Sequence, residues 1–312
     1  MNPVSSPAVR VTALLAGIAL LAGACSASVA GTSAPATSAP STAATTAPAS
    51  PGAGGSSTTG STAFKTLTPG VLYVSLTDGD LPEISVGPNN TLVGTDGYWI
   101  TQFANKYHLT LKLFPTTLAS EILAVSQNKV DLGTTAFYTT ARAKQVYYTY
   151  PFYRDVTGVY TMDTFSYSGP SSLNGKQIGT VSGYVYVPYM QQTYGTANVH
   201  IYTTIAEADA ALINGQIVGL VNGSGSNPIL EANGHVTFHQ FTVGQLGMPQ
   251  NVIQTQAYNY VNCGNSALAN ALNAELQSLQ SNASWQGALK QYGLTSPLDV
   301  APLQSPQQLC TP

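Results

Sequence analysis

The stretch LTLKLFPTTLASEILAVSQNKVDLG, residues 109–133, predicts most of one folding unit. Leu109 to Phe114 is a short apolar run typical of a strand, Leu118 to Gln127 has helical spacing, and Val130 to Gly133 is again strand-like. A strand, a helix and a second strand in this order form the crossover unit of a parallel sheet. The sequence therefore predicts the α/β fold class.

The same alternation continues on both sides of this stretch. Upstream, a strand is expected from Val71 to Leu76 and a helix from about Tyr98 to Tyr107, which completes a β-α-β-α-β lobe. After Pro170 the pattern starts again and predicts a second lobe of similar plan. Its expected strands lie at 177–181, 199–202 and 217–222, and its helices at 186–194 and 205–213. Two more helices are expected at 266–279 and 284–292, where apolar residues recur at intervals of three and four.

Residues 1–24 have the features of a signal peptide. A single charge at Arg10 precedes the mostly apolar run from Val11 to Leu21, and small residues follow. The run is shorter than the roughly 20 apolar residues that a membrane-spanning helix needs. Leu21 to Cys25 resembles the lipobox of bacterial lipoproteins, which implies that Cys25 receives lipid. An ordinary signal peptide cleaved beside a cysteine is the alternative.

Residues 25–65 are expected to form a flexible linker behind this anchor. From Ser26 to Phe64 the sequence is almost entirely Ala, Ser, Thr, Pro and Gly and carries no charge, so it cannot bury enough apolar surface to offset the entropy of ordering. A spacer of this kind suits a chain that is fixed to a membrane at its start and must reach outward.

Two cysteines remain, Cys263 and Cys310. In an exported chain an even pair permits a disulfide, which would pin the C-terminal tail to the body of the protein. Two free thiols are the alternative.

Several short motifs recur in an order that a known family shares: Leu92 to Gly94, Asn128 to Asp131, Thr139 to Arg142, Tyr150 to Phe152, Leu173 to Lys176, Ala211 to Gly215, Asn265 to Leu268 and Tyr292 to Leu294. From Pro69 to Pro302 the chain resembles the amino-acid-type extracellular solute-binding proteins of ABC importers. The resemblance implies a two-lobed periplasmic-binding-protein-like fold, with a ligand cleft between lobes joined by two crossing segments near 153–158 and 252–258. Lobe 1 is expected at 66–155 and 255–302, lobe 2 at 156–254, and a C-terminal tail at 303–312.

The resemblance also implies a set of ligand-binding residues. Arg142 occupies the position whose guanidinium takes the ligand carboxylate, and Thr139 could cap its helix; an ordinary surface arginine is the alternative. Asp80 could meet a cationic group of the solute, although a solvated turn is the competing interpretation. The full expected set is Arg142, Thr135, Phe137, Asp80, Leu118, Tyr184 and Asn222.

Three positions depart from the family pattern. Phe137 stands where the family usually has a Ser or Thr that supports the carboxylate, and Gly183-Tyr184 stands where it usually has a Gly-Thr pair. The most damaging departure is Gly223. At Gly223 the amino-acid binders usually have an Asp that holds the ammonium group of the ligand. A buried ammonium without a counter-charge would be costly, and Asn222 beside it cannot neutralise a charge. This departure places a normal α-amino acid in doubt.

The sequence therefore predicts an exported, lipid-anchored, monomeric binding protein that delivers a small polar, carboxylate-bearing solute to an ABC permease. A ligand sensor and a dehydratase-like enzyme on the same fold are the alternatives. Only 7% of residues are charged, the net charge is −3 and no basic run occurs, which argues against nucleic-acid binding. No cofactor motif is found. His235 and His239 would lie about 13 Å apart on a strand, too far for one zinc ion, so no metal is expected.

Overall fold

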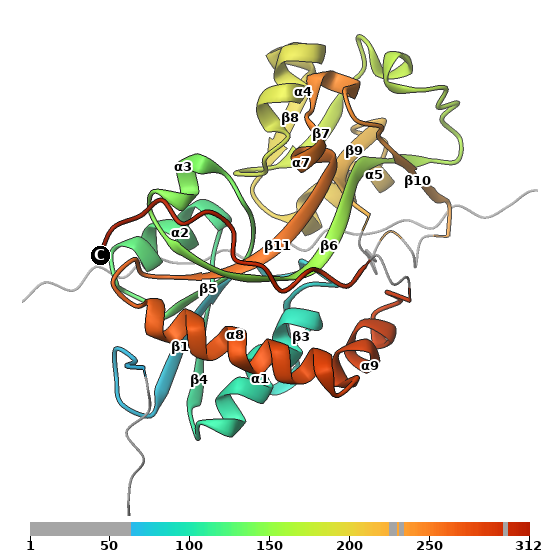
Figure 1. Ribbon diagram of the computed structural model, residues 1–312. Coiled ribbons are helices and arrows are strands. Elements are labelled where there is room, and N and C mark those ends of the chain that lie inside the picture. The colour runs from blue at the N-terminus through green and yellow to red at the C-terminus, as the bar shows by residue number, and fades with distance from the viewer. Residues whose placement is uncertain (1–63, 225–229, 231–233, 296–298) are drawn as a thin grey trace, which may run out of the picture. The chain divides into compact units, whose positions relative to one another are not determined.

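The computed structural model describes residues 64–224, 230, 234–295 and 299–312. These residues form two α/β lobes (Figure 1). The predicted signal peptide, Cys25 and most of the predicted linker lie outside the described residues. Within the described part, no helix combines the length and hydropathy needed to cross a membrane.

Lobe 1 is built on a sheet whose strands follow the order β4-β1-β5-β11-β6. The strand β1 (Val71–Leu76) runs parallel to both β4 (Thr110–Pro115) and β5 (Leu132–Phe137). The helices are α1 (Thr95–Lys106), α2 (Leu118–Ser126), α8 (Ser266–Ser281) and α9 (Ser284–Gln291), and a small hairpin pairs β2 (Ser85–Gly87) with β3 (Thr91–Val93).

Lobe 2 repeats this plan on a smaller scale. Its strands β7 (Ile178–Val181), β8 (Val199–Tyr202) and β9 (Gly219–Gly223) are parallel, and its helices are α4 (Val187–Tyr194), α5 (Ile205–Ile213) and the short α7 (Gln250–Ile253). Pro188 is accommodated because it lies in the first turn of α4, where a backbone N–H has no helical partner. The helix α5 starts with a capping box formed by Thr204 and Glu207.

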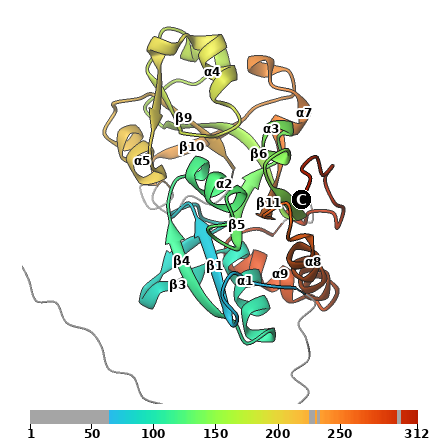
Figure 2. The same ribbon diagram turned by 90° about the vertical axis from the view of Figure 1, so that its left-hand side faces the viewer.

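Two long strands join the lobes. The first half of β6 (Tyr147–Met162) pairs with β11 (Gln254–Val261) in lobe 1, and its second half pairs with β9 and β10 (Val236–Gln240) in lobe 2. Figures 1 and 2 show β6 and β11 passing side by side from one lobe to the other. The predicted two-lobed fold with two crossing segments is confirmed.

Each lobe has its own hydrophobic core. In lobe 1, the apolar face of α8 buries Leu268, Leu272 and Leu276 against a cluster that contains Trp99 and Trp285. The indole N–H of Trp99 donates to the carbonyl of Leu272 at 3.1 Å, so α1 and α8 are also joined by a polar contact. The principal core of lobe 2 contains Tyr186, Met190, Val221 and Phe241.

Phe64, the second-to-last residue of the predicted linker, packs into lobe 1. The predicted linker extends to residue 65, but Phe64 is 4% exposed and its ring packs against Phe103 and Tyr107 at the end of α1. The burial of an aromatic ring removes a large apolar surface from water and favours this packing. Phe64, near the end of the predicted linker, therefore belongs to the core of lobe 1.

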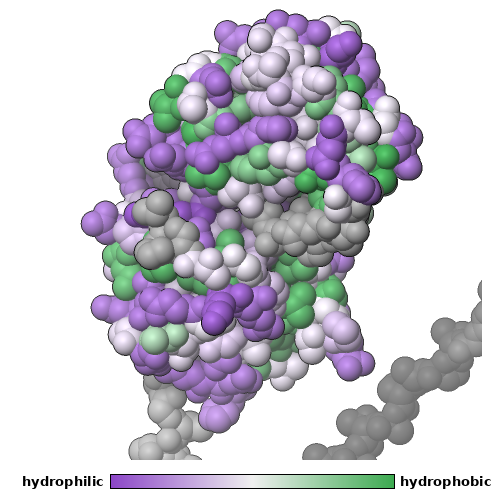
Figure 3. Space-filling model, turned by 90° about the vertical axis from the view of Figure 1, so that its right-hand side faces the viewer, coloured by the Kyte–Doolittle hydropathy of each residue, from purple (hydrophilic) through white to green (hydrophobic). Residues whose placement is uncertain are grey.

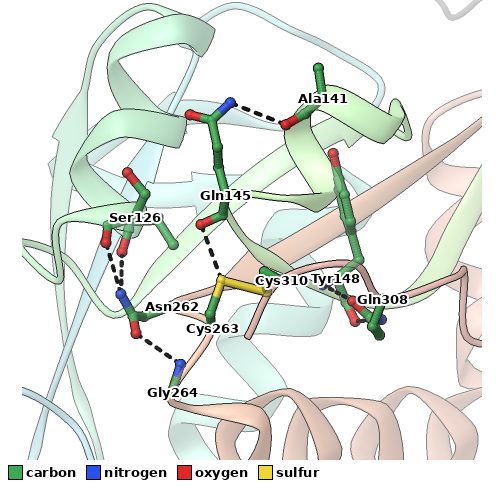
Figure 4. The surroundings of a disulfide bond; sticks show 10 residues. Ser126, Ala141, Gln145, Tyr148, Asn262, Cys263, Gly264, Gln308 and Cys310 are labelled. Carbon is green, nitrogen blue, oxygen red and sulfur yellow. Dashed lines mark hydrogen bonds between the residues drawn. A yellow bond between two sulfur atoms is a disulfide. The ribbon is translucent and has the colours of Figure 1, made fainter. Parts of the chain in front are cut away.

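The C-terminal tail lies along β6 and is covalently fixed. Val300 forms an isolated β-bridge with Tyr153, and the side-chain amide of Gln308 exchanges two hydrogen bonds with the backbone of Tyr148. Cys263 and Cys310 form a disulfide with their Cα atoms 5.7 Å apart (Figure 4). The tail is thus part of lobe 1.

The surface reflects the low charge content of the chain. On the face shown in Figure 3, hydrophilic and hydrophobic residues are interleaved over both lobes. Among the described residues, the exposed large apolar side chains are Leu67, Phe114, Leu123, Ile201 and Val243, which are spread along the sequence. Scattered apolar residues of this kind are ordinary on a soluble surface.

Candidate functional site

A cavity between the lobes brings the predicted ligand-binding residues together. Lobe 1 contributes Asp80, Leu118, Thr135, Phe137 and Arg142 to its lining, and lobe 2 contributes Tyr184 and Asn222. All seven predicted residues thus border one space. The lining also includes residues that the sequence did not single out, among them Glu83, Asp155, Tyr186 and Ile205.

Arg142 lies where the two lobes meet. It belongs to the short helix α3 (Thr140–Ala143), whose N-cap Thr139 accepts a hydrogen bond from the Arg142 backbone N–H at 3.1 Å. The guanidinium donates from Nη1 to the carbonyl of Phe137 at 2.8 Å and from Nη2 to the carbonyl of Gly183 in lobe 2. A guanidinium has five N–H donors, so these two bonds leave donors that can meet a carboxylate.

Thr135 has a strained backbone at the wall of the cavity. Its φ is 46°, in the left-handed region that a β-branched residue rarely adopts. The Asn259 side chain holds it by accepting from the Thr135 N–H at 3.2 Å, opposite a break in the register between β5 and β11. The hydroxyl of Thr135 donates to the buried carboxyl of Asp96, which Asn259 also contacts. The two strands and α1 together therefore fix this part of the wall.

Two tyrosines form the facing wall in lobe 2. The hydroxyl of Tyr184 donates across the cleft to Asp80 Oδ1 at 3.2 Å, and the hydroxyl of Tyr186 donates to Asn222 Oδ1 at 2.9 Å. The two rings meet edge to face with centroids 5.5 Å apart. Asp80 is therefore a partner of lobe 2, unlike Asp78, which is exposed and accepts hydrogen bonds from Ser85 and Val86 within its turn.

Glu83 and Asp155 make the cavity more acidic than the sequence suggested. Each is 5% exposed and lines the cavity. Glu83 is positioned by the start of α1, because the Asp96 N–H donates to its backbone carbonyl at 2.9 Å. Asp155 lies in β6 opposite Thr255 of β11, in the segment that joins the lobes.

The buried carboxyls hold their protons unusually tightly. Burial raises the pKa of Asp80 to about 7 and that of Asp155 to about 6. Burial and repulsion from Asp80 and Asp155 raise the pKa of Glu83 well above its usual value. Arg142 is the one positively charged side chain among the described residues that line the cavity. The cavity therefore has an excess of acidic groups.

Contrary to what the sequence suggested, Gly223 does not leave the cavity without a nearby carboxylate. Gly223 does lack a carboxylate, but Asp155 stands directly beside it: a Cβ on Gly223 would lie 1.7 Å from Asp155 Oδ2. The cavity therefore contains carboxylates that a comparison at position 223 alone does not reveal. One signal was present in the sequence, because Asp155 is the one acid in the crossing strand Tyr147–Met162.

The same carboxyls predict how stability depends on pH. Burial raises the pKa of Asp96 to about 7 and of Glu121 to about 8, as it does for Asp80 and Asp155. The native state thus retains protons that the unfolded chain loses near pH 4, and the free energy of unfolding falls as pH rises through these values. Burial lowers the pKa of His239 and acts in the opposite sense, but through one partly buried group.

We expect a higher melting temperature at pH 5 than at pH 8 in thermal unfolding without added solute. The Glu121→Gln variant should show a weaker dependence, since it removes a carboxyl whose pKa burial raises to about 8. A melting temperature that rises over this interval in the wild-type protein would contradict the assignment.

The family follows from a match that spans most of the chain. The family model described as bacterial extracellular solute-binding proteins, family 3, matches residues 73–295. The chain belongs to this family. Its members bind solutes, and a comparison with curated protein sequences gave no match.

Solved structures agree with the fold. A Salmonella typhimurium periplasmic binding protein described for its high arginine specificity is 18% identical, with a TM-score of 0.63 over 71% of this chain and 98% of that chain. A substrate-binding protein of an ABC uptake transporter from Streptococcus pneumoniae, with bound histidine, is 17% identical, with a TM-score of 0.62 over 74% and 94%. A histidine kinase sensor domain is 14% identical, with a TM-score of 0.62 over 74% and 98%.

Proposed function

We propose that this chain captures an amino-acid-like solute outside the cytoplasm and delivers it, as a monomer, to an ABC permease. The observation that carries the proposal is the interlobe cavity, whose lining combines the guanidinium of Arg142 with the partly buried Asp80 and the buried Glu83 and Asp155. Arg142 would bind the carboxylate of the solute, and the acidic groups would bind its cationic part.

Hinge motion would admit the solute. The remaining cavity has a volume of about 40 Å³, enough for a few water molecules but not for an amino acid. Two hydrogen bonds, from Arg142 to Gly183 and from Tyr184 to Asp80, cross from one lobe to the other. Entry therefore requires these contacts to open, with β6 and β11 as the hinge strands.

The charges of the cavity favour a solute with more positive than negative groups. Asp80, Glu83 and Asp155 outnumber Arg142, and a buried carboxylate is stabilised by a cation within contact distance. The similar structures described for arginine specificity and for bound histidine are consistent with this choice. A cationic amino acid is the proposed class of solute.

A thermal-shift screen tests the proposed function. The body beginning at Thr59 is one compact unit and retains Phe64. We expect arginine, lysine, ornithine or histidine to raise its melting temperature, while glutamate and aspartate do not. A ligand at 100 times its Kd should add about 2.7 kcal/mol to the free energy of unfolding. Stabilisation by acidic amino acids alone would reject the proposed class.

The segment that starts at Cys25 and ends before Phe64 would attach the protein to the membrane. We propose that Cys25 is the lipid-bearing residue and that the uncharged spacer behind it lets the two lobes reach solute and permease. In cells we expect Cys25→Ser to move the protein from the membrane fraction into the soluble fraction, as measured by immunoblotting. Ser26→Ala is the matched control and should stay with membranes. Retention of Cys25→Ser on membranes would contradict the anchor.

A sensor is the second candidate. The likeness to a histidine kinase sensor domain favours it, because the same two-lobed body can report solute binding to a partner. Loss of uptake of the radiolabelled solute on deletion of the protein supports transport, whereas unchanged uptake with altered gene expression supports sensing. The dehydratase-like alternative has less support, since the described lobe 2 residues that line the cavity include no acid.

A further inference from the structure

We infer that Asp155, a residue of the hinge strand β6, holds a cationic group of the solute through its Oδ2 atom, and that position 223 is glycine to leave room for this oxygen. The inference rests on the proposed function and identifies which carboxylate receives the cation. It would make the strand that joins the lobes part of the binding site.

The two oxygens of Asp155 have unequal surroundings. Oδ1 accepts from the Ser224 N–H at 2.8 Å, the Ser224 hydroxyl at 2.7 Å and the Val156 N–H at 2.8 Å, with the Tyr153 hydroxyl at 3.4 Å. Oδ2 accepts no hydrogen bond from any residue that the structure describes. A carboxylate has about four lone-pair sites, so Oδ2 can accept further donors from a group in the cavity that Asp155 lines.

The position of Oδ2 explains why residue 223 is glycine, whereas its backbone conformation does not require glycine. Its φ lies outside the left-handed region, so other residues could adopt the same conformation. A Cβ there would lie 1.7 Å from Oδ2 and 2.8 Å from Cγ of Asp155, which is within the volume of the carboxylate. The carboxylate of Asp155 can therefore occupy this position only because residue 223 has no side chain.

Among the described residues no cation forms an ion pair with Asp155, although Arg154 lines a neighbouring pocket with it. Glu83 and Asp80 face the same cavity and repel it, and Tyr184 and Tyr186 stay neutral because burial raises the pKa of each phenol further. Among the described lining residues only Arg142 is cationic, and two of its N–H groups are used by the carbonyls of Phe137 and Gly183. A cation brought by the solute would supply the missing charge.

A purely structural role for Asp155 explains only half of these observations. The bonds to Oδ1 fasten the end of β9 to the hinge strand, and any acceptor at this atom would do so. They do not account for Oδ2 or for the space left at Gly223. The two roles differ in their response to an amide, because Asp155→Asn keeps an acceptor for Ser224 and Val156 but removes the charge.

The test compares ligand binding and stability in the full chain. L-arginine is titrated calorimetrically at pH 8, together with argininic acid, in which a hydroxyl replaces the α-ammonium, and agmatine, which lacks the carboxylate. L-arginine and argininic acid differ in charge only at the α-ammonium group. For Asp155→Asn we expect at least a tenfold loss of affinity for L-arginine, for argininic acid or for both. The melting temperature without ligand should not fall. Asp163→Asn, an exposed acid bonded to Thr237, is the matched control and should leave both unchanged.

A second pair of variants tests the link to position 223. Gly223→Ala should displace the carboxylate and weaken L-arginine binding at least tenfold. The double variant Asp155→Ser with Gly223→Asp restores a carboxylate to the same space from β9 and should bind within about tenfold of the wild type.

The outcomes separate the inference from the proposed function. If the wild type binds none of the three probes and no other cationic amino acid, the proposed function fails and the inference falls with it. If the wild type binds but Asp155→Asn binds equally well, or loses melting temperature without changing its preference among the probes, the inference alone is overturned.

Discussion

Replacing Arg142 with Ala should weaken binding of the best cationic amino acid at least 100-fold, which corresponds to about 2.7 kcal/mol at 25 °C. The guanidinium lies at the cavity wall with donors still available after its bonds to Phe137 and Gly183. Removal of one partner of a buried, hydrogen-bonded charge pair commonly costs 2–5 kcal/mol, or about 30-fold to several thousand-fold in affinity. Isothermal titration calorimetry measures the change.

A ligand analogue separates carboxylate binding from closure of the cleft. Arg142 also joins the lobes through Gly183, so its loss could weaken every ligand alike. The carboxamide of the same amino acid lacks the negative charge, and the difference in affinity between acid and amide should disappear in Arg142→Ala. Lys144→Ala, an exposed cation directly after α3, is the control and should preserve that difference. An equal loss for acid and amide would assign Arg142 to closure alone.

Removal of the disulfide should lower the melting temperature by about 10 °C. Cys263 and Cys310 are 47 residues apart, and a loop of this length restricts the unfolded chain by about 4 kcal/mol in the chain-entropy model. For a body of this size, 1 kcal/mol corresponds to about 2–4 °C. The Cys263→Ser and Cys310→Ser double variant, followed by circular dichroism during heating, gives the measurement.

Chemical reduction provides the control for this prediction. The wild-type protein heated with a phosphine reductant should match the double variant, while the reductant should not shift the double variant further. Gln308 holds the same tail to Tyr148 by two hydrogen bonds, so Gln308→Ala should have a much smaller effect than loss of the disulfide. A shift below 2 °C on reduction would show that the tail stays in place without its covalent link.

Elements with strong local signals could be predicted closely from the sequence. The predicted bounds match the structure for two strands, Val71–Leu76 and Val199–Tyr202, and for the helix Ile205–Ile213. Apolar periodicity indicates all three, and a capping box indicates the start of the helix. The helix α1 begins at Thr95, three residues before the prediction, because its N-cap Gly94 offers no side-chain cap to mark the start.

Long-range contacts explain where the prediction of β5 failed. The strand was expected at 130–133 but spans Leu132–Phe137, because pairing with β11, more than 100 residues later, extends it. Thr135 contributes to the cavity wall only through this pairing and its unusual φ. Local periodicity carries no information about either contact.

The candidate site divides in the same way. Arg142, Asp80 and Tyr184 could be placed from motif order, and the structure brings them to one cavity. Glu83 and Asp155 could not be placed in this way. Glu83 lines the cavity because of its contact with the first turn of α1, and Asp155 lines it because β6 crosses between the lobes. A comparison limited to position 223 consequently missed a carboxylate 68 residues earlier in the chain.

Both ends of the described chain belong to lobe 1. Phe64 is buried in its core, and Cys310 is bonded to Cys263 beside it, whereas lobe 2 is an insertion with no free end. A fluorophore or affinity tag at Lys65 or at the C-terminal Pro312 therefore reports the position of lobe 1 and leaves lobe 2 unlabelled. Energy transfer from a terminal donor to an acceptor at the exposed Thr196, after α4, would follow the swing of the inserted lobe during each binding event.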